Sequence, residues 1–384
     1  MRVLAAILVY NGREFVPACV ESAVRLRTAA TVDVDVLVLD DCSPEPGWSE
    51  ELARRCAELD VSCYRSPRNL GIPRNMNLAA LWALSRDYDH LLLLNSDVVL
   101  PANLADVLVE VASSQPSVGS VTAWSNAASL YSLPNDESDP SVSRPDMVDW
   151  ISARLYDEFA ASVLDVPTGV GFCMLVPTPA LRQVGLLDPV YGRGYCEEVD
   201  WNLRARSAGL RSLLAPGTFV YHLGRGSTID AGVVGLHQMS VAHNERIIDF
   251  RHPQYRSQLL DFTCSGVLPP LQERGAGAVV RAAARRWGYT VEATAIPRPC
   301  PEGAIQFVID PREGAMAFTG HFAGFSAQLS VSSEAPLATL AALLGRLPDR
   351  VGVFGWGPNA DRLAAESYAA GIVFDDVTNY PERV

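Results

Sequence analysis

The sequence predicts an α/β protein whose first part is a mostly parallel sheet with helices on both faces. Three apolar runs are long enough to be buried strands, at residues 3–10, 34–41 and 90–100. The stretches between them carry apolar residues at helical spacing, at residues 15–30, 50–60 and 75–87. Strands that alternate with helices in this way form parallel sheets that are covered on both sides.

The pattern changes after about residue 120. A long segment rich in Ser, Asn, Asp and Pro predicts a loop that could cover a site, at residues 125–146. After it we expect a helix, two strands and a further helical run, at Met147–Ser162, 170–177, 212–224 and up to about Phe250.

Two domains are expected, a larger α/β domain at residues 1–255 and a small C-terminal α/β module at residues 256–384. In the module, VGVFGWGPNA at 351–360 precedes a helical stretch and IVFDD at 372–376. This is a G-x-G-x-x-A pattern with an acid about twenty residues later, as in Rossmann-like units. The chain ends soon after Asp376, so we expect one partial βαβ unit. A structural or partner-binding role is favoured over cofactor binding.

Composition excludes several classes of protein. The net charge of −13 argues against a nucleic-acid binder, which needs basic stripes to neutralise phosphates. Eight cysteines without CxxC pairs indicate reduced thiols and a cytoplasmic protein. The first apolar run is interpreted as a buried strand rather than a signal peptide, and no run approaches the roughly 18 apolar residues of a membrane span.

Polar residues end each of the first strands, where ligands bind in parallel sheets. Tyr10 follows the first strand, and Asp40 and Asp41 end the second. The two aspartates could cap a turn, or one could accept hydrogen bonds from a nucleobase or a ribose. Asn95 and Asp97 would lie on the same side of an extended segment, where their oxygens suit Mg²⁺ or Mn²⁺; an Asx turn is the alternative.

Two further segments are candidates for contact with a phosphate or a sugar. In RNLGIPRNMN, Gly71 permits close backbone approach, and Arg74 and Asn77 supply polar groups; a turn before a helix would need no such role. His222 follows a strand and precedes a glycine-rich segment, so it could be a metal ligand, a phosphate contact or a structural residue.

The segment GRGYCEEVDW places three carboxylates within four positions: Glu197, Glu198 and Asp200. They could form the acidic first turn of a helix, which the helix dipole favours. One of them could instead take a proton from a substrate. Both interpretations can hold together, because a helix N-terminus can carry a catalytic acid.

Taken together, LVYNG, VLDDCSPE, NLGIPRNMN, LLLLNSDVVL, the acidic segment and the His222 segment resemble family-2 glycosyltransferases of the GT-A type, with a Rossmann-like sheet. The resemblance covers residues 1 to about 250. It is strongest to bacterial members that act in polysaccharide, O-antigen or natural-product glycosylation. It implies a nucleotide-diphospho-sugar as donor and Mn²⁺ or Mg²⁺ as cofactor.

The resemblance also implies roles for individual residues. Tyr10 and Asp40, or Asp41 instead, would hold the nucleobase and ribose. The triplet Asn95-Ser96-Asp97 takes the place of the family's DxD motif, with one acid replaced by Asn. Asp97 would remain the principal metal ligand, and His222 would complete the metal or diphosphate site.

On the acceptor side, the resemblance makes Glu198 the catalytic base, in the second position of the family's ED-type motif. Asp200 is expected to pair with Arg204 one helical turn later, or to orient other groups. Glu197 is expected to bind the acceptor.

The sequence therefore predicts a metal-dependent inverting glycosyltransferase that moves a hexosyl or deoxyhexosyl group to a hydroxyl on a glycan, a lipid-linked acceptor or a natural product. A sugar nucleotidyltransferase and a weakly catalytic nucleotide-sugar-binding scaffold are the alternatives. The first would want a Gly-rich, Arg- or Lys-bearing loop after the first strand, which VYNGREFV lacks. Donor, acceptor, peripheral membrane contact and homo-oligomer formation stay open.

Overall fold

The computed structural model describes the chain in seven segments: residues 1–134, 140–224, 238–294, 303–310, 317–332, 334–355 and 357–376. These form two compact units. The first unit is Met1–Ser132 with Ser143–Val267, and the second is Leu133–Val142 with Leu268–Val384. The first unit thus runs past residue 255, where the sequence suggests a domain boundary. That each unit is a domain in its own right stays a prediction.

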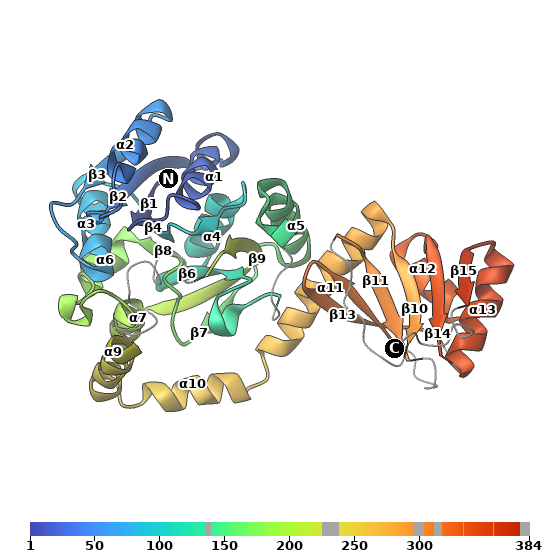
Figure 1. Cartoon of the computed structure of the whole chain (residues 1–384). Helices are drawn as coiled ribbons and strands as arrows, with labels where there is room; N and C mark the ends of the chain where they lie inside the picture. The colour runs from blue at the N-terminus through green and yellow to red at the C-terminus, as the bar shows by residue number, and fades with distance from the viewer. Residues whose placement is uncertain are drawn as a thin grey trace. The chain divides into compact units, whose positions relative to one another are not determined.

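The first unit is built on one sheet, in the order β3-β2-β1-β4-β8-β6-β9-β5, with β7 paired to β9 (Figure 1). Its strands are β1 (Arg2–Val9), β2 (Asp33–Asp40), β3 (Ser62–Arg65), β4 (His90–Asn95), β5 (Val98–Val99), β6 (Val118–Ser125), β7 (Leu164–Val166), β8 (Cys173–Pro177) and β9 (Arg211–His222).

The parallel arrangement expected from the sequence holds for β3-β2-β1-β4. Beyond β4 the sheet is mixed, because β8 runs antiparallel to both β4 and β6. The predicted α/β class is therefore confirmed.

The described helices of the first unit are α1 (Val16–Ala29), α2 (Trp48–Glu58), α3 (Ile72–Ser85), α4 (Leu104–Ser114), α5 (Pro145–Phe159), α6 (Thr178–Val184), α7 (Glu197–Ser207), α9 (Gln238–Arg251) and α10 (Tyr255–Cys264). Short 3₁₀ turns lie at Ser129–Tyr131, Pro140–Ser143 and Pro189–Tyr191. The helix predicted from Met147 is therefore present as α5. The predicted loop at 125–146 contains the first two 3₁₀ turns, and its residues 135–139 lie outside the described residues.

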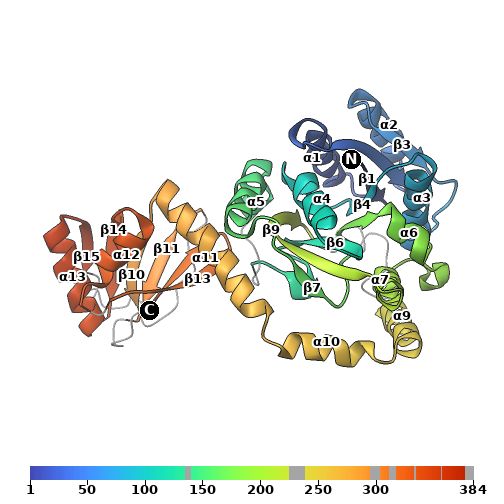
Figure 2. The same cartoon turned by 180° about the vertical axis from the view of Figure 1, so that it is seen from behind.

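One face of the sheet is covered by α3, α6 and α7, which share a single buried apolar cluster with β1, β2, β4 and β8. Met76 and Trp201 are fully buried members of this cluster, from α3 and α7. Figure 2, from the opposite side, shows α7 and α9 next to each other. The buried face of α7 explains why an acidic segment can form a stable helix: Trp201 and Ala205 pack into the core while the acids occupy its first turn.

Strand β6 was not expected from the sequence. All eight of its residues are buried, although Ser120, Thr122 and Ser125 interrupt its apolar pattern. The Ser120 hydroxyl donates to Asn202 Oδ1 at 2.5 Å, and the Thr122 hydroxyl donates to the Cys173 carbonyl at 3.0 Å. Buried hydroxyls with such partners cost little, so a strand can carry them in the core.

The second unit contains a six-stranded sheet in the order β13-β12-β11-β10-β14-β15. Its described elements are α11 (Leu268–Trp287), β10 (Thr290–Thr294), β11 (Gln306–Ile309), β12 (Ala317–Phe322), β13 (Phe325–Ser330), α12 (Pro336–Leu344), β14 (Arg350–Phe354), α13 (Pro358–Ala370) and β15 (Val373–Asp376). Strands β14 and β15 are parallel and joined by α13, so the predicted βαβ unit forms one edge of this larger sheet.

Among the described helices, none combines the length and the apolar character that crossing a membrane requires.

Candidate active site

The ends of β1, β2 and β4 lie side by side at one edge of the sheet. In the strand register, Val9 is paired with Asp40, and Leu8 is paired with Asn95. Tyr10, half-buried, directly follows β1. The polar residues that the sequence places at three strand ends therefore meet at one edge, as parallel pairing requires.

Asp40 is fully engaged inside the protein. Its carboxylate accepts hydrogen bonds from the Ser43 amide at 2.9 Å, the Ser43 hydroxyl at 2.6 Å and the Ser49 hydroxyl at 2.5 Å. The Arg65 Nε lies 3.3 Å from Oδ2, and the side chain of Asp40 is only 1% exposed. Asp40 thus shapes the turn between β2 and α2, which is the capping role considered for it. Direct contact with a nucleotide stays a prediction.

Asp41 holds the segment that precedes α3. Its two oxygens accept the backbone amides of Leu70 at 2.7 Å and Gly71 at 2.8 Å. Burial raises the pKa of Asp41, against the lowering effect of these two amides and, more weakly, of the Arg193 charge. Gly71 is therefore fixed at the rim of the candidate site.

Gly71 also contacts a second loop. Its φ is +81°, and an added Cβ would lie 2.3 Å from the carbonyl oxygen of Gly192. The Ile72 amide donates to the Arg193 carbonyl at 3.2 Å, and a Cβ on Gly194 would lie 2.7 Å from Ile72 Cδ1. The backbones of the NLG and GRG segments, more than a hundred residues apart in the sequence, are thus in direct contact.

The other two polar residues of this region serve the same framework. The Asn77 amide group exchanges two hydrogen bonds with the backbone of Leu187, at 2.8 and 2.9 Å. The exposed Arg74 donates to the Leu70 carbonyl at 3.4 Å. Asn77 therefore links α3 to the segment before α7, whereas the charged end of Arg74 is exposed to solvent. That either residue contacts a donor stays a prediction.

Asn95, Asp97 and His222 come together beside this edge. His222 Nε2 lies 3.2 Å from Asp97 Oδ1 and 3.4 Å from Asn95 Nδ2. Strand β5 pairs with β9 so that Val98 is opposite His222, which explains the meeting. Asn126 donates to the His222 carbonyl and accepts its amide, both at 2.8 Å, and so fixes the end of β9. Ser96 between the two polar residues is fully buried, and its hydroxyl makes no hydrogen bond within the described residues.

His222 is oriented as a metal-ligating histidine commonly is. Its Nδ1 lies 2.8 Å from the Ala127 carbonyl, to which it can donate, and this directs Nε2 toward Asp97. Burial works to lower the pKa of His222, but the hydrogen bond and charge of Asp97 outweigh it and raise that pKa. No cluster of three His, Cys, Asp or Glu side chains that could hold a metal occurs in the described part of the chain.

This pair nonetheless fits a Mg²⁺ or Mn²⁺ site of the kind completed by substrate. Such ions are commonly held by one or two protein carboxylates together with the phosphates of the substrate. Asp97 supplies one carboxylate oxygen, His222 one imidazole nitrogen, and Asn95 an amide at 3.4 Å from that nitrogen. The remaining positions would be left for diphosphate oxygens and water.

Glu197 and Glu198 form the first turn of α7, as the sequence suggests. Glu197 is 4% exposed, and Glu198 is half-buried. The Oε2 atom of each is buried and accepts no hydrogen bond from the described residues. Burial, followed by the charge of Glu198, raises the pKa of Glu197 well above its ordinary value. Burial also raises the pKa of Glu198, opposed by the backbone amides of Glu198 and Val199. Two neighbouring buried carboxyls, each with one oxygen that accepts no hydrogen bond, are costly, and such groups cluster at functional sites.

The backbone before these acids is strained and is held from α9. Tyr195 and Cys196 have φ values of +72° and +75°, which L-residues rarely adopt. The amide nitrogen of Asn244, buried in α9, lies 2.9–3.0 Å from the carbonyl oxygens of Tyr191, Gly194 and Tyr195. Asn244 therefore fixes the turn that presents Glu197 and Glu198.

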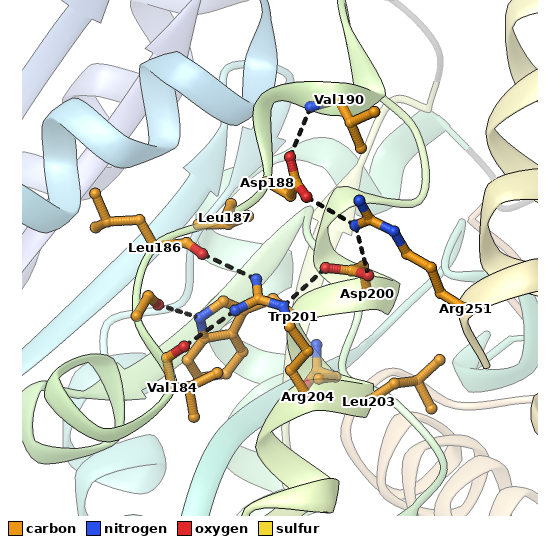
Figure 3. A network of polar contacts seen from close by, with 12 residues as sticks. Val184, Leu186, Leu187, Asp188, Val190, Asp200, Trp201, Leu203, Arg204 and Arg251 are labelled. Atoms are coloured by element: carbon orange, nitrogen blue, oxygen red, sulfur yellow. Dashed lines mark hydrogen bonds and ion pairs between the residues drawn. The ribbon is translucent and has the colours of Figure 1, made fainter.

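Asp200 lies in a network of ion pairs with Arg204, His252 and Arg251 (Figure 3). Its carboxylate lies 2.8 Å from Arg204 Nε, 3.0 Å from His252 Nε2 and 3.4 Å from Arg251 Nη1. Arg251 also pairs with Asp188 at 2.7 Å. Burial would raise the pKa of Asp200, but the hydrogen bonds of His252 and Arg204 lower it overall. The predicted pairing with Arg204 is confirmed, and the network joins α7 to α9.

One short segment connects the two candidate centres. Phe172 stacks on His222, with ring centroids 5.2 Å apart and an interplanar angle of 15°. A Cβ on the adjacent Gly171 would lie 3.5 Å from Cγ of Glu198. The Phe172 carbonyl accepts the Asn95 amide at 2.9 Å, which anchors the segment to the end of β4. The His222–Asp97 pair and Glu198 therefore neighbour two consecutive residues of one segment.

Several residues of this region were not found by sequence reasoning. Thr168 accepts the Tyr131 hydroxyl through its carbonyl at 3.0 Å. Burial raises the pKa of Tyr255 and the nearby Glu198 charge adds to this, whereas the Thr168 side chain lowers it. Sequence reasoning also did not find Asn244 and His252. Only the "PTGVGFCM" segment offered a signal, because glycines beside a buried strand indicate close backbone approach.

Known proteins resemble this chain in sequence. Residues 5–182 match the model of Glycosyl transferase family 2. The undecaprenyl-phosphate mannosyltransferase of Micrococcus luteus is 27% identical over 245 residues, which are 61% of this chain and 90% of that protein.

Solved structures are also similar, at low identity. GalNAc-T7 with UDP, GalNAc and Mn²⁺ has 15% identity and a TM-score of 0.44, over 57% of this chain and only 43% of its own. The mannosyltransferase PcManGT from Pyrobaculum calidifontis, with GDP-Man and Mn²⁺, has 15% identity and a TM-score of 0.41; the match covers 74% of this chain and 75% of that one. S. aureus TarS with UDP-GlcNAc has 13% identity and a TM-score of 0.44; the match covers 74% of this chain and 81% of that one.

The family match covers β1 to α6, including the ends of β1, β2 and β4 and the Gly171–Phe172 segment. The acidic turn of α7, His222 and Asn244 lie beyond it. The chain is therefore a glycosyltransferase that carries a domain of glycosyl transferase family 2 at residues 5–182.

Proposed function

We propose that this enzyme moves a sugar from a nucleotide-diphospho-sugar to a hydroxyl acceptor, with inversion at the anomeric carbon and with Mn²⁺ or Mg²⁺ bound at Asp97 and His222. One observation carries the proposal. Glu198 lies beside Gly171, and His222, which pairs with Asp97, stacks on the adjacent Phe172. This nearness supports the proposal, because in inverting transfer a base and a leaving-group site act on the same sugar.

The donor would bind along the ends of β1, β2 and β4. Tyr10 and the Asp40–Asp41 turn would contact the nucleoside, and the segment from Gly71 to Asn77 would line the sugar and phosphates. When bound here, the ion would neutralise charge on the diphosphate. Asp97 and His222 would hold it, and Asn95 and Ser96 would lie beside it.

The acceptor would bind on the side of α7. Glu198 would take the proton of the acceptor hydroxyl while the hydroxyl oxygen forms its bond to the anomeric carbon and the bond to the diphosphate breaks. The raised pKa of Glu198 suits this step, since a stronger base accepts the proton more readily. Glu197 would bind the acceptor, and Asp200 would hold α7 in place through Arg204, His252 and Arg251.

Two alternatives are less well supported. A nucleotidyltransferase would want a basic Gly-rich loop after β1, where this chain has NGREF. A scaffold without catalysis is favoured only by Asn95 in place of an acid. The buried Oε2 atoms of Glu197 and Glu198, which accept no hydrogen bond from the described residues, argue against it, because a binding protein would gain stability by losing these carboxyls.

Thermal unfolding with UDP, GDP, TDP and CDP, each with and without Mn²⁺, tests the donor site. One nucleotide should raise the melting temperature more than the others, and Mn²⁺ should increase that shift. Transfer from the matching nucleotide-sugar is then measured against a panel of hydroxyl acceptors. Binding without turnover would support the scaffold, and no shift with any nucleotide would refute the donor site.

A further inference from the structure

Asn202 is a fully buried side chain of α7 that connects this helix to the sheet. Its Nδ2 donates to the Glu198 carbonyl at 2.7 Å and lies 3.5 Å from Met174 Sδ. Its Oδ1 accepts the Ser120 hydroxyl at 2.5 Å and the Ser212 hydroxyl at 2.8 Å. The two serines are paired in the register of β6 and β9. Asn202 therefore links the first turn of α7 to two neighbouring strands.

The same network lies against the segment that borders the side chain of Glu198. A Cβ added to Gly169 would lie 3.0 Å from Ser120 Oγ and 3.4 Å from Asn202 Oδ1. Two residues later, a Cβ on Gly171 would lie 3.5 Å from Cγ of Glu198. The backbone of Glu198 is thus held by Asn202, and its side chain borders a segment that itself packs against Asn202.

We propose that Asn202 is a positioning residue that fixes the Glu198 carboxyl relative to the segment from Gly169 to Gly171, and hence relative to the acceptor. The inference rests on the proposed function, in which Glu198 is the base. A bond from Asn to a carbonyl one helical turn earlier is common and needs no tertiary partner. The two hydroxyls on Oδ1 go further, because they come from strands 82 and 10 residues away and fix the amide from its other side.

An amide of this length meets both demands of the position. Nδ2 donates to a carbonyl oxygen, and Oδ1 accepts from two hydroxyls. An aspartate would keep the acceptor but set a second oxygen against the Glu198 carbonyl, and a leucine would keep the shape but lose both functions. Because Asn202 is 0% exposed, bulk water does not replace a lost partner. Either change should therefore displace the first turn of α7.

Steady-state kinetics of Asn202→Leu in the full chain test the proposal, with the nucleotide-sugar that the unaltered enzyme uses. We expect kcat to fall about 10²-fold, as for a shift of about 1 Å at a reacting group, while the donor KM stays within about threefold. Ser152→Ala is the control: this buried hydroxyl in α5 lies 2.7 Å from Asn103 Oδ1 and 3.0 Å from the Thr218 hydroxyl. It should lower the melting temperature but not kcat. An unchanged kcat in Asn202→Leu, or equal changes in kcat and donor KM, would overturn the proposal.

Asn202→Asp gives a readout that a general loss of stability would not move. A protonated carboxyl has one O–H donor and can restore the bond to the Glu198 carbonyl, whereas an ionised one cannot. Burial raises the pKa of a carboxyl by up to several units, so the kcat ratio of unaltered enzyme to variant should rise between about pH 5 and pH 9. Glu198 titrates in both enzymes, and the other groups around the position, Ser120, Ser212 and Met174, do not ionise in this range. A ratio above one that is independent of pH would refute the donated bond.

Hydrogen exchange of the peptide that spans residues 196–203 tests the same link without a donor or an acceptor. The Asp200 amide donates to the Cys196 carbonyl at 2.9 Å, in the turn that carries Glu198. Asn202→Leu should speed exchange in this peptide, and Ser152→Ala should not. Unchanged exchange in Asn202→Leu would refute the positioning role. Absence of transfer by the unaltered chain would instead refute the proposed function, and the exchange rates would still show whether Asn202 holds the turn.

Discussion

His222 Nε2 lies 3.2 Å from Asp97 Oδ1, although Asp97 lies in the turn between β4 and β5 and His222 at the distant end of β9. The contact depends on the pairing of β5 with β9 and on the Asn126 side chain, which holds the His222 backbone from both sides. Phe172 stacks on the imidazole, and the adjacent Gly171 lies next to Glu198. The candidate site is therefore held by the sheet itself, and its parts can be altered one at a time.

Glu198→Gln should lower kcat by about 10²–10⁴-fold, because the amide cannot accept the acceptor proton. Nucleotide binding, measured by thermal shift, should be unchanged. Glu50→Gln is the matched control, since Glu50 is exposed in the first turn of α2. Full transfer activity in the Glu198 variant would exclude this residue as the base.

Removal of the divalent ion should abolish transfer, and added Mn²⁺ should restore it. Asp97→Asn removes the carboxylate charge and should lower activity by about 10²-fold or more, since a metal at the leaving group supplies several kcal/mol. Asp33→Asn, at the exposed start of β2, should behave as the unaltered enzyme. Activity that is insensitive to both chelator and Mn²⁺ would contradict the metal assignment.

Glu197→Gln should stabilise the protein at neutral pH while it impairs acceptor binding. Folding raises the pKa of Glu197, so the folded state keeps a proton at pH values where the unfolded chain, with a pKa of about 4.3, has lost it. Stability of the unaltered protein therefore falls as pH rises from that value through the raised folded pKa. The glutamine has no proton to lose, so its advantage should grow across this window and then level off.

Unfolding of the Glu197 variant at a series of pH values measures this difference. Each kcal/mol gained should raise the melting temperature by about 2–4 °C. Glu50→Gln should show no such pH-dependent gain. A melting temperature below that of the unaltered protein at pH 7 would contradict the inferred cost of the buried carboxyl.

Asn244→Asp should reduce kcat more than it weakens donor binding. A carboxylate cannot donate to the carbonyls of Tyr191, Gly194 and Tyr195, so the strained turn before Glu197 should relax. A shift of about 1 Å at a reacting group can cost about 10²-fold in rate. His243→Ala, at an exposed position of the same helix, is the control. Equal loss of donor affinity and kcat would indicate general unfolding instead of misplacement.

Gly71→Ala should be far more damaging than Gly47→Ala. Both glycines have positive φ, +81° and +72°, but only at Gly71 would the added Cβ meet backbone, 2.3 Å from the Gly192 oxygen. Gly47→Ala should cost about 1–2 kcal/mol for the left-handed conformation alone. Chemical denaturation compares the two variants. Equal losses would show that the NLG and GRG loops can separate without cost.

Local pattern was sufficient for much of the fold. Continuous apolar runs predicted β1, β2 and β4, and helical spacing between them predicted α1, α2 and α3, because burial on both faces leaves a plain hydrophobic signature. Strand β6 was not predicted, because its Ser and Thr side chains look like loop residues until their partners in the folded core are known. The antiparallel direction of β8 was not predicted either, since the residues of a strand do not show which way it runs in a sheet.

For the site, the sequence by itself determined which carboxylates stand at strand and helix ends, and hence the candidates Asp97, Glu197 and Glu198. Tertiary structure decided how they are used. It turned Asp40 and Asp200 inward to multiple partners, and it left Glu197 and Glu198 buried with unsatisfied oxygens. It also brought Asn244, in α9, to the Tyr191 carbonyl, and His252, just after α9, to the Asp200 carboxylate. Spacing along a chain shows what can ionise; burial and hydrogen-bond partners, which depend on long-range packing, decide which acid stabilises the fold and which is left for chemistry.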